Sequence, residues 1–240
     1  EERIFDVDRA RVQRIFAHAR SEGRTSLPEY EAMQVLDAYG FPVLKSGLAA
    51  SRQELPALGA KVGFPLVMKI ASPDILHKTE MGGVAVGVPD LPAAEQVYDR
   101  MMAAARERYP QARIWGIYVQ QLAAKGREVI LGTARDPKFG AIVMFGLGGI
   151  YTEALKDVTF RVAPLRQLSA RRMLEQIRGR KILEGTRGEP PADLDALQEC
   201  LERLSQLVIE FPVIEELDIN PLIAYAKGAS VADARIILGE

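Results

Sequence analysis

Apolar and polar positions follow a helical period in some segments of the chain and a two-residue period in others. Residues 8–19 carry apolar side chains at helical spacing, which predicts a helix near the N-terminus. Ser26 with Glu29, and Ser51 with Glu54, match the Ser-x-x-Glu capping box, which predicts the start of a helix at each place. We therefore expect an appended N-terminal helix followed by two capped helices.

Apolar runs bounded by glycine, proline and polar residues predict the strands. The expected strands cover residues 43–44, 66–70, 83–88, 114–122, 128–134, 141–145 and 159–163, with a closing pair between 214 and 238. Further helices are expected at residues 92–108, 170–178 and 193–209. Several hairpins among helices are typical of an α+β fold rather than of a purely parallel sheet.

The composition limits the kinds of partner that we expect. The length of 240 residues fits one large domain or two interlocked lobes. Lys and Arg total 31 against 32 for Asp and Glu, so the net charge of −1 provides no general attraction to nucleic acid or anionic lipid. No apolar run approaches the roughly 18 residues that span a membrane, and we expect a cytoplasmic protein. Cys200 is the only cysteine, which excludes an intramolecular disulfide and a cysteine-based metal cluster.

Lys69 is the one charged residue in the apolar strand expected at residues 66–70. Strand alternation turns it away from the apolar side chains next to it. The polar loop that follows contains His77, one of only two histidines, and ends in Gly82 and Gly83. Glycines let backbone N–H groups approach a phosphate, and a neutral imidazole can accept a phosphoryl group. A solvent-exposed lysine and an ordinary loop histidine are the alternatives at these positions.

The closing strands contain candidate metal ligands. Asp218 and Asn220 lie on one face of a strand and offer oxygen donors of the kind that Mg²⁺ prefers. If the closing hairpin is centred between residues 226 and 227, Asn220 lies opposite Asp233, and cross-strand partners share a face. The same register places Arg235 opposite Asp218, so an ordinary ion pair is the alternative for Asp218. A slip of one residue would turn Asp233 away.

The segment between these two regions offers candidate contacts to a nucleotide base. Gln120, Gln121 and Leu122 end one expected strand shortly before the next strand begins at Glu128. Two strands joined by a short loop can offer backbone groups to an adenine ring. Glu128 can accept hydrogen bonds from ribose hydroxyls, and a plain surface residue is the alternative for it.

A glycine-rich loop at residues 146–149 is followed by Glu153 and Asp157 and is similar to a phosphate cradle or a flexible flap. It matches neither the dinucleotide-binding nor the Walker A fingerprint. Arg161, in the next expected strand, is a catalytic candidate because a guanidinium binds phosphate well, with a surface salt bridge as the alternative.

Five motifs occur together in an order that is seen in one protein family. They are residues 69–83, 126–128, 144–150, 155–158 and 218–221. From about Ser26 to the end, the chain resembles the ATP-grasp β subunit, or fused β domain, of ADP-forming acyl-CoA (acetyl-CoA) synthetases. More distantly it is similar to the β subunit of succinyl-CoA synthetase.

The resemblance implies an ATP-grasp fold of two α+β lobes with the nucleotide between them. The expected lid lobe covers about residues 46–121, and the larger lobe covers about 26–45 plus 122–240. Residues 1–25 would form the appended N-terminal helix.

In that family acyl-CoA, ADP and phosphate are converted reversibly to acid, CoA and ATP through an acyl phosphate and a phosphohistidine. The resemblance implies that Lys69 contacts the nucleotide phosphates and that His77 is a second phosphoryl carrier. Asn220 and Asp233 would hold Mg²⁺, with Asp218 as a further candidate. Phosphoryl transfer depends on positioning and on charge neutralisation by such groups.

The resemblance also implies that residues 120–122 line the adenine and that Glu128 serves the nucleotide. The chain contains no Gly-His-x-Gly phosphohistidine loop and no glycine fingerprint for CoA. We therefore expect an acid-thiol ligase that needs a CoA-binding α subunit or fused α domain, in a hetero-oligomer. The alternatives are a nucleotide-sensing domain attached to another enzyme, such as a protein acetyltransferase, and an ATP-grasp carboxylate-amine ligase.

Overall fold

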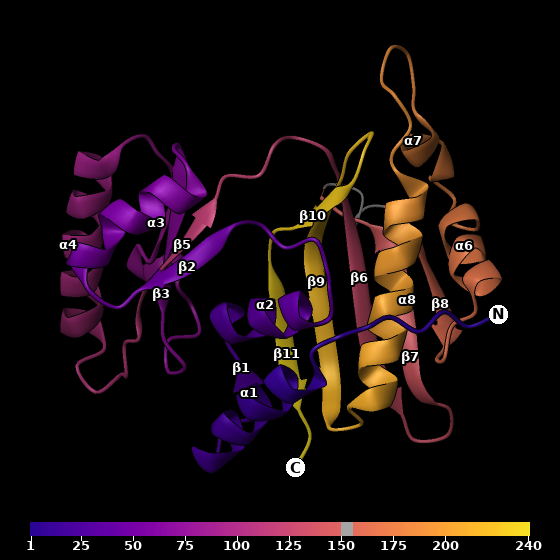
Figure 1. Cartoon of the computed structure of the whole chain (residues 1–240), viewed down its shortest axis with the longest axis horizontal. Helices are drawn as coiled ribbons and strands as arrows, with labels where there is room; N and C mark the ends of the chain where they lie inside the picture. Colours follow the sequence, from indigo (N-terminus) through magenta and orange to yellow (C-terminus); the bar gives the residue numbers. More distant parts are fainter. Residues whose placement is uncertain (150–155) are drawn as a thin grey trace. The chain divides into compact units, whose positions relative to one another are not determined.

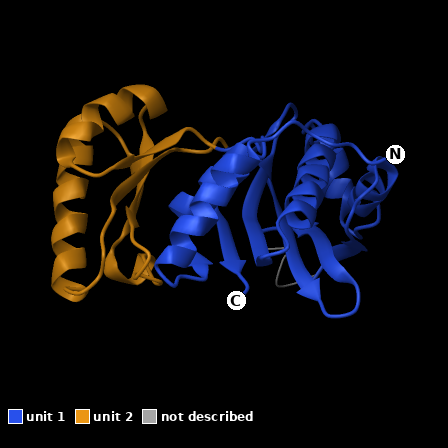
Figure 2. Ribbon diagram, turned by 60° about the horizontal axis from the view of Figure 1, so that its bottom comes forward, with its two compact units in different colours: residues 1–43, 125–240 blue, residues 44–124 orange. Residues whose placement is uncertain are grey.

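A computed structural model describes residues 1–149 and 156–240 of the chain. Within this part the chain forms two compact units (Figure 2). Unit 1 contains Glu1–Val43 and Lys125–Glu240, and unit 2 contains Leu44–Ala124. Each unit has its own antiparallel sheet and its own helices, which confirms the predicted α+β class.

The sheet of unit 1 has the strand order β1-β11-β9-β6-β7-β8, with β10 paired to β9. All of these pairings are antiparallel. The strands are β1 (Ser26–Leu27), β6 (Arg127–Asp136), β7 (Gly140–Leu147), β8 (Val158–Val162), β9 (Ile214–Ala224), β10 (Ala229–Val231) and β11 (Ala234–Leu238).

Helices cover one face of this sheet. The helix α2 packs on β11, α8 packs on β6 and β7, α6 packs on β8 and α8, and α1 packs on α2. In Figure 1, α2 and α8 lie in front of the strands. The helices of unit 1 are α1 (Arg9–Ser21), α2 (Glu29–Ala38), α6 (Gln167–Glu175), α7 (Arg180–Glu184) and α8 (Leu194–Glu210).

Strand alternation separates an apolar face of the unit 1 sheet from a polar one. Leu131, Leu217 and Ile219 are fully buried. Asp218 and Asn220 point to the opposite face, where Asp218 is half-buried and Asn220 is exposed. The polar side chains that the sequence analysis singled out on β9 therefore lie on the face away from the buried core.

The segment before α1 is fastened to α8. The backbone N–H of Phe5 donates to the Gln206 side chain at 2.8 Å, and the Gln206 amide donates to the Phe5 carbonyl at 3.1 Å. Arg3 forms an ion pair with the buried Glu202 at 2.8 Å. These contacts make the N-terminal segment part of unit 1.

Unit 2 has a four-stranded sheet with the order β2-β5-β3-β4. Its core contains Leu66, Met68 and Ile70 from β3 together with Met101 from α4. The elements of unit 2 are β2 (Ser46–Ala49), the 3-10 turn η1 (Arg52–Glu54), α3 (Leu55–Val62), β3 (Leu66–Ala71), the 3-10 turn η2 (Thr79–Met81), β4 (Val84–Val88), α4 (Leu91–Arg108) and β5 (Gly116–Gln121).

One of the two predicted capping boxes is present. Ser51 and Glu54 form the reciprocal hydrogen bonds of the box at the start of η1, as predicted. The prediction of a capping box at Ser26 is wrong, because Ser26 pairs with Ile237 as part of β1 and Pro28 occupies the N-cap position of α2. Ser26 therefore lies two residues before the N-cap position, and its side chain does not cap α2.

One predicted strand is also wrong. Residues 43–44 form no strand, and Val43 makes only an isolated bridge to Val231. The strands expected at residues 114–122 and 128–134 both form but do not pair with each other, because β5 pairs with β2 and β3 while β6 pairs with β7 and β9. Residues 122–126 instead connect the two units.

Cys200 lies buried on α8 as a free thiol, and burial raises its pKa to about 12. Such a thiol is neutral at physiological pH and behaves as a small apolar side chain.

Among the helices formed by the described residues, none has both the length and the apolar character needed to cross a membrane.

Candidate functional site

Lys69 lies in the middle of β3, between β4 and β5, and its side chain points away from the core of unit 2. Its ammonium donates to the side-chain oxygen of Gln120 at 3.1 Å. Gln120 is only 2% exposed, so this acceptor is held in place by its surroundings. The strand alternation therefore turns Lys69 to the face that the sequence predicted. Lys69 and Gln120, which were predicted separately for the phosphates and the adenine, contact each other.

The loop between β3 and β4 exposes His77. Ile75 before it and Met81 after it are buried, which fixes the loop on both sides of the histidine. Gly82 has a φ of +74°, a conformation that favours glycine, and its N–H donates to Thr79. The N–H of Gly83 donates to the carbonyl of Lys78 at 2.7 Å. Both glycines thus serve the turn itself, and their contact with phosphate stays a prediction.

At the end of β5, Gln121 is half-buried and Leu122 is 37% exposed. The Gln121 N–H donates to the Lys45 carbonyl at 2.8 Å, and the Gln121 side-chain oxygen accepts from the Lys45 N–H at 3.3 Å. Because β5 does not pair with β6, an adenine contact by these residues would use the end of β5 and the segment after it.

The closing strands pair in the predicted register. The turn is centred between residues 226 and 227, since Tyr225 donates to Gly228, and Arg235 lies opposite Asp218. The Asn220 N–H donates to the Asp233 carbonyl at 3.1 Å, so these two residues are direct neighbours across the strands. The symmetry of the hairpin was enough to predict this pair.

A β-bulge lies in β9 beside β6. Val129 pairs with Leu222 and Leu131 pairs with Ile219, so Asn220 and Pro221 together face Ile130. An extra residue of this kind bends the strand and redirects side chains. Asn220 stays on the same face as Asp218, while the residues after the bulge change their alternation.

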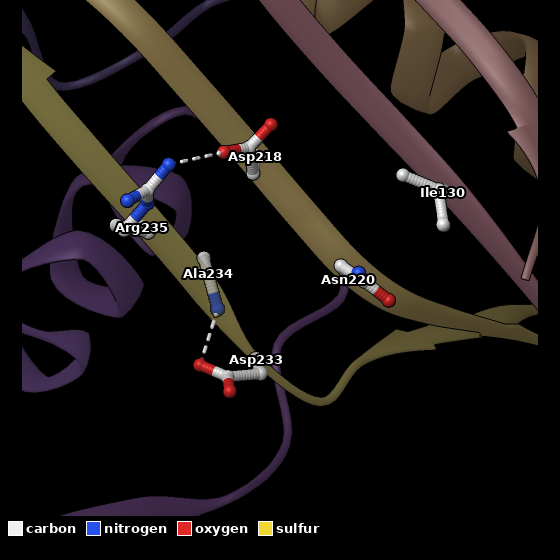
Figure 3. A pocket seen from close by; sticks show the side chains of 6 residues that line it. All are labelled: Ile130, Asp218, Asn220, Asp233, Ala234 and Arg235. Carbon is white, nitrogen blue, oxygen red and sulfur yellow. Dashed lines mark hydrogen bonds and ion pairs between the residues drawn. The ribbon is translucent and has the colours of Figure 1, made fainter. Parts of the chain in front are cut away.

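These side chains line a pocket of about 360 Å³ in unit 1. Figure 3 shows its lining from the neighbouring strands β6, β9 and β11 and from Asp233, which directly precedes β11. The residues drawn there are Ile130, Asp218, Asn220, Asp233, Ala234 and Arg235.

Two of the three acidic or amide candidates already have partners within this pocket. Arg235 donates to Asp218 at 3.1 Å, which is the ion pair that the register offered as the alternative (Figure 3). One carboxylate oxygen of Asp233 accepts from the backbone N–H of Ala234 at 2.8 Å. Asp233 is exposed, so its carboxylate can be reached from solvent. No group of three or more His, Cys, Asp and Glu side chains within the described residues can hold a metal ion alone.

Glu128 lines a second pocket of about 360 Å³ in unit 1, beside the glycine-rich loop. The N–H of Gly148 donates to the Glu128 carbonyl at 2.8 Å. A Cβ atom at Gly149 would lie 2.8 Å from a carboxylate oxygen of Glu128, so the absence of a side chain lets the two approach. This contact joins two motifs that the sequence analysis treated separately.

The sequence analysis missed other residues of this pocket. Arg127, Thr186 and Glu189 also line it, and Arg127 forms an ion pair with Glu189 at 3.4 Å. The segment after α7 carries no recognisable motif, so nothing in the sequence indicated that it reaches the glycine-rich loop.

Asp157 is a structural residue in this arrangement. It is buried, and its carboxylate accepts the backbone N–H groups of Arg178 at 2.7 Å and Gly179 at 2.6 Å. Glu153 lies outside the described residues.

Arg161 on β8 lies apart from both pockets. It donates to the side chain of Gln176 and to the carbonyl of Phe160. Three strand spacings separate β8 from β9, or roughly 14 Å at the usual spacing. A catalytic role for Arg161 stays a prediction, and its described contacts hold it against residues outside the two pockets.

The sequence-predicted residues divide between the two units. Unit 2 carries Lys69, His77, the two glycines and residues 120–122, whereas unit 1 carries Glu128, the closing-strand residues and Arg161. Within unit 2 the structure supplies a cation, an imidazole and a polar amide. Within unit 1 it supplies carboxylates, an amide and a glycine-lined pocket. These are the groups that a phosphorylated ligand with a divalent cation requires.

Comparison with known proteins shows what this arrangement is similar to. The model of a family described as the ATP-grasp domain matches residues 18–238. The chain is 42% identical over 229 residues to the β subunit of ADP-forming acetate–CoA ligase I from Pyrococcus furiosus, covering 95% of this chain and 98% of that one.

Two further similar proteins are a longer ligase and a solved structure with bound ligands. The 4-hydroxybutyrate–CoA ligase (ADP-forming) of Nitrosopumilus maritimus is 41% identical over 97% of this chain, which spans only 34% of that protein. A solved structure of acetyl-coenzyme A synthetase 1 from Ca. Korarchaeum cryptofilum has a TM-score of 0.84 and 39% identity, covering 95% of this chain and 99% of that one. That structure holds coenzyme A and Mg-AMPPCP, with its phosphohistidine segment pointing towards the nucleotide binding site.

Proposed function

The chain belongs to the ATP-grasp domain family, and from this premise we propose that it is the nucleotide-binding, phosphoryl-transfer component of an ADP-forming acyl-CoA ligase. The observation that carries the proposal is the 42% identity to an acetate–CoA ligase β subunit over almost the whole of both chains. The resemblance drawn from the five sequence motifs is thereby confirmed.

Unit 2 supplies the groups that bind and receive phosphate. Lys69, steadied by the buried Gln120, binds the nucleotide phosphates as a point charge. The segment at residues 120–122 contacts the base through its backbone. His77 is the phosphoryl carrier, because an exposed imidazole on a loop with buried flanks is accessible to a donor and held in place.

Phosphoryl transfer from ATP to His77 needs no reactant other than these two groups. The lone pair of a neutral ring nitrogen attacks the terminal phosphorus and forms an N–P bond. The bond from phosphorus to the bridging oxygen breaks, its electron pair stays on the leaving diphosphate, and the proton of the other ring nitrogen passes to solvent. In the direction of ATP synthesis a partner's phosphohistidine first passes its phosphoryl group to the neutral His77 ring. Phospho-His77 then passes the group to a terminal oxygen of ADP by the same steps in reverse, taking up a proton from solvent.

Unit 1 supplies the groups that suit Mg²⁺. Asn220 and Asp233 are neighbours that offer hard oxygen donors at an open pocket, and Asp218 lies one pair further along. Mg²⁺ is commonly held by one or two carboxylates together with substrate phosphates, so the small donor set fits. A bound Mg²⁺ would neutralise charge on the phosphoryl group. Glu128, whose backbone carbonyl accepts from Gly148 and whose carboxylate lies beside Gly149, hydrogen-bonds the nucleotide at the second pocket.

The acyl and CoA chemistry belongs to a partner in this proposal. The chain spans almost all of the separate β subunit and about a third of the longer ligase that it matches. A CoA-binding α subunit or domain with a phosphohistidine loop would therefore complete the enzyme, as a hetero-oligomer. The acid group is set by that partner.

Labelling with radioactive ATP tests the phosphoryl-transfer role. The chain, its CoA-binding partner and Mg²⁺ are incubated with ATP labelled at the terminal phosphate, and acid-labile protein phosphate is measured. We expect label on His77 that is absent in His77→Ala, which still binds nucleotide. Tight nucleotide binding without label, with the partner present, would contradict the proposal and favour a nucleotide-sensing domain.

A further inference from the structure

The loop that carries His77 is fastened to the segment between α4 and β5 by one acidic residue. The carboxylate of Asp74 accepts from the Arg113 backbone N–H at 2.7 Å and from the Arg113 Nε at 3.1 Å. Its other oxygen accepts from the Arg113 Nη2 at 3.0 Å. A two-pronged contact of this kind between a guanidinium and a carboxylate fixes orientation as well as distance.

Ser72 extends the same contact. Its hydroxyl donates to the Arg113 carbonyl and accepts from the Asp74 N–H, and its side chain is buried. Arg113 is therefore held at its N–H, its carbonyl and its guanidinium by two residues of the loop. The segment is itself tied to β3, since the Trp115 N–H donates to Ala71.

The far side of the loop is fastened separately. Arg108 at the end of α4 donates to the Glu80 carbonyl at 3.0 Å, and Gly83 donates to Lys78. His77 thus lies three residues after Asp74 and three before Glu80, and is itself exposed between these two anchored residues. Three residues span at most about 10 Å, so each fixed point limits how far the imidazole can move.

We propose that Asp74 and Arg113 are positioning residues that hold the His77 loop in place for phosphoryl transfer. This inference rests on the proposed role of His77. Neither residue belongs to the proposed phosphate site, because Lys69, which binds the phosphates in this proposal, and Gln120, which holds it, make their contact between β3 and β5. Loss of the Asp74–Arg113 contact should therefore slow the transfer to His77 and leave nucleotide binding intact.

Arg113→Ala is the direct test, and unit 2 offers a matched control. Arg52 also forms ion pairs with two carboxylates, those of Glu95 and Asp99, and its side chain has the same 46% exposure as that of Arg113. Arg52→Ala removes the same charge from the same unit without touching the loop. Arg113→Lys keeps the charge but loses the fork, and Asp74→Asn keeps the shape but loses the charge.

Two measurements on the full chain with its CoA-binding partner decide the question. The first is the rate at which ATP labels His77, with its KM for ATP, and the second is hydrogen–deuterium exchange of the amides at residues 75–80. For Arg113→Ala we expect a rate about 10- to 100-fold lower, a KM close to wild type, and faster exchange. Asp74→Asn should behave like Arg113→Ala, and Arg113→Lys should regain part of the labelling rate. Arg52→Ala should match wild type in both the labelling rate and the exchange.

Each other outcome contradicts the inference in a distinguishable way. Unchanged labelling in Arg113→Ala would overturn it even if the exchange rises. Unchanged exchange together with slow labelling would show that Arg113 acts by another route and would also overturn it. If wild-type His77 takes no label, the proposed function fails and the positioning role fails with it, whatever the exchange shows.

Discussion

At the scale of single residues, the symmetry of the closing hairpin predicts which side chains become neighbours, which composition does not. Asn220 and Asp233 are equidistant from the turn, and the structure pairs them. The sequence could not decide between metal binding and ion pairing for Asp218, because both use the same face. Arg235 forms the ion pair in the structure. A bound cation would compete with that guanidinium for the Asp218 carboxylate. Asp218 is therefore the weakest of the three candidate Mg²⁺ ligands.

Substitution of the closing-strand ligands should weaken the requirement for Mg²⁺ more than it harms the fold. We expect Asn220→Ala and Asp233→Asn each to raise the Mg²⁺ concentration needed for half-maximal ATP labelling by at least about tenfold, which corresponds to about 1.4 kcal/mol. Both residues are exposed, so the melting temperature should change little. Glu215→Gln, exposed on the same strand, is the control and should match wild type. Equal Mg²⁺ dependence in all three variants would exclude these residues as ligands.

Asp193 gives a pH-dependent prediction about stability. Its carboxylate accepts from the N–H groups of Gly228 and Ala196, and these bonds lower its pKa. A lowered folded-state pKa stabilises the protein above the unfolded pKa of about 4, and this contribution is lost as the pH falls through the folded-state value.

Asp193→Ala should therefore lower the free energy of unfolding by about 1 to 2 kcal/mol at pH 7 through loss of the helix cap. The difference from wild type should shrink as the pH falls below about 4. Denaturant titration at several pH values measures it, with Asp195→Ala in the same helical turn as the control. A difference that stays constant down to pH 2 would contradict the assigned cause.

At the scale of elements, the hydrophobic period located helices and strands but could not assign their partners. The 114–122 and 128–134 segments were correctly expected to be strands, yet they belong to different sheets. Period alone carries no information about which edge a strand will join. The short α7 and β1 were missed for a related reason, since five and two residues are too few to show a period.

The glycine-rich loop after β7 gives a prediction at this scale. Gly149 and Gly140 lie at opposite ends of β7 and both have positive φ, at +63° and +80°. An alanine at either position should cost about 1 to 2 kcal/mol of stability. Only at Gly149 would the new Cβ meet the Glu128 carboxylate, while at Gly140 it would meet open space.

We therefore expect Gly149→Ala to weaken ATP binding and Gly140→Ala to leave ATP binding unchanged. The two variants should lose similar amounts of folding stability. Isothermal titration with a non-hydrolysable ATP analogue measures the difference. Equal affinities in the two variants would show that the contact between Glu128 and the loop plays no part in nucleotide binding.

At the scale of the whole molecule, the chain matches one complete subunit in one relative and one third of a longer chain in another. The near-zero net charge and the spacing of the motifs do not indicate a partner. The proposal of a CoA-binding partner comes from the family resemblance together with the phosphohistidine and CoA motifs that this sequence does not contain. The placement of the nucleotide between the two lobes stays a prediction. This placement is what the resemblance to the family implies.

The most direct test of the account is ATP formation by the reconstituted enzyme. The chain is mixed with a CoA-binding partner that carries a phosphohistidine loop, together with acetyl-CoA or another short acyl-CoA, ADP, phosphate and Mg²⁺. We predict ATP formation that depends on the chain and that is lost in Lys69→Met and His77→Ala. No ATP from any short acyl-CoA, with a folded chain that binds ADP and the partner, would contradict the central claim.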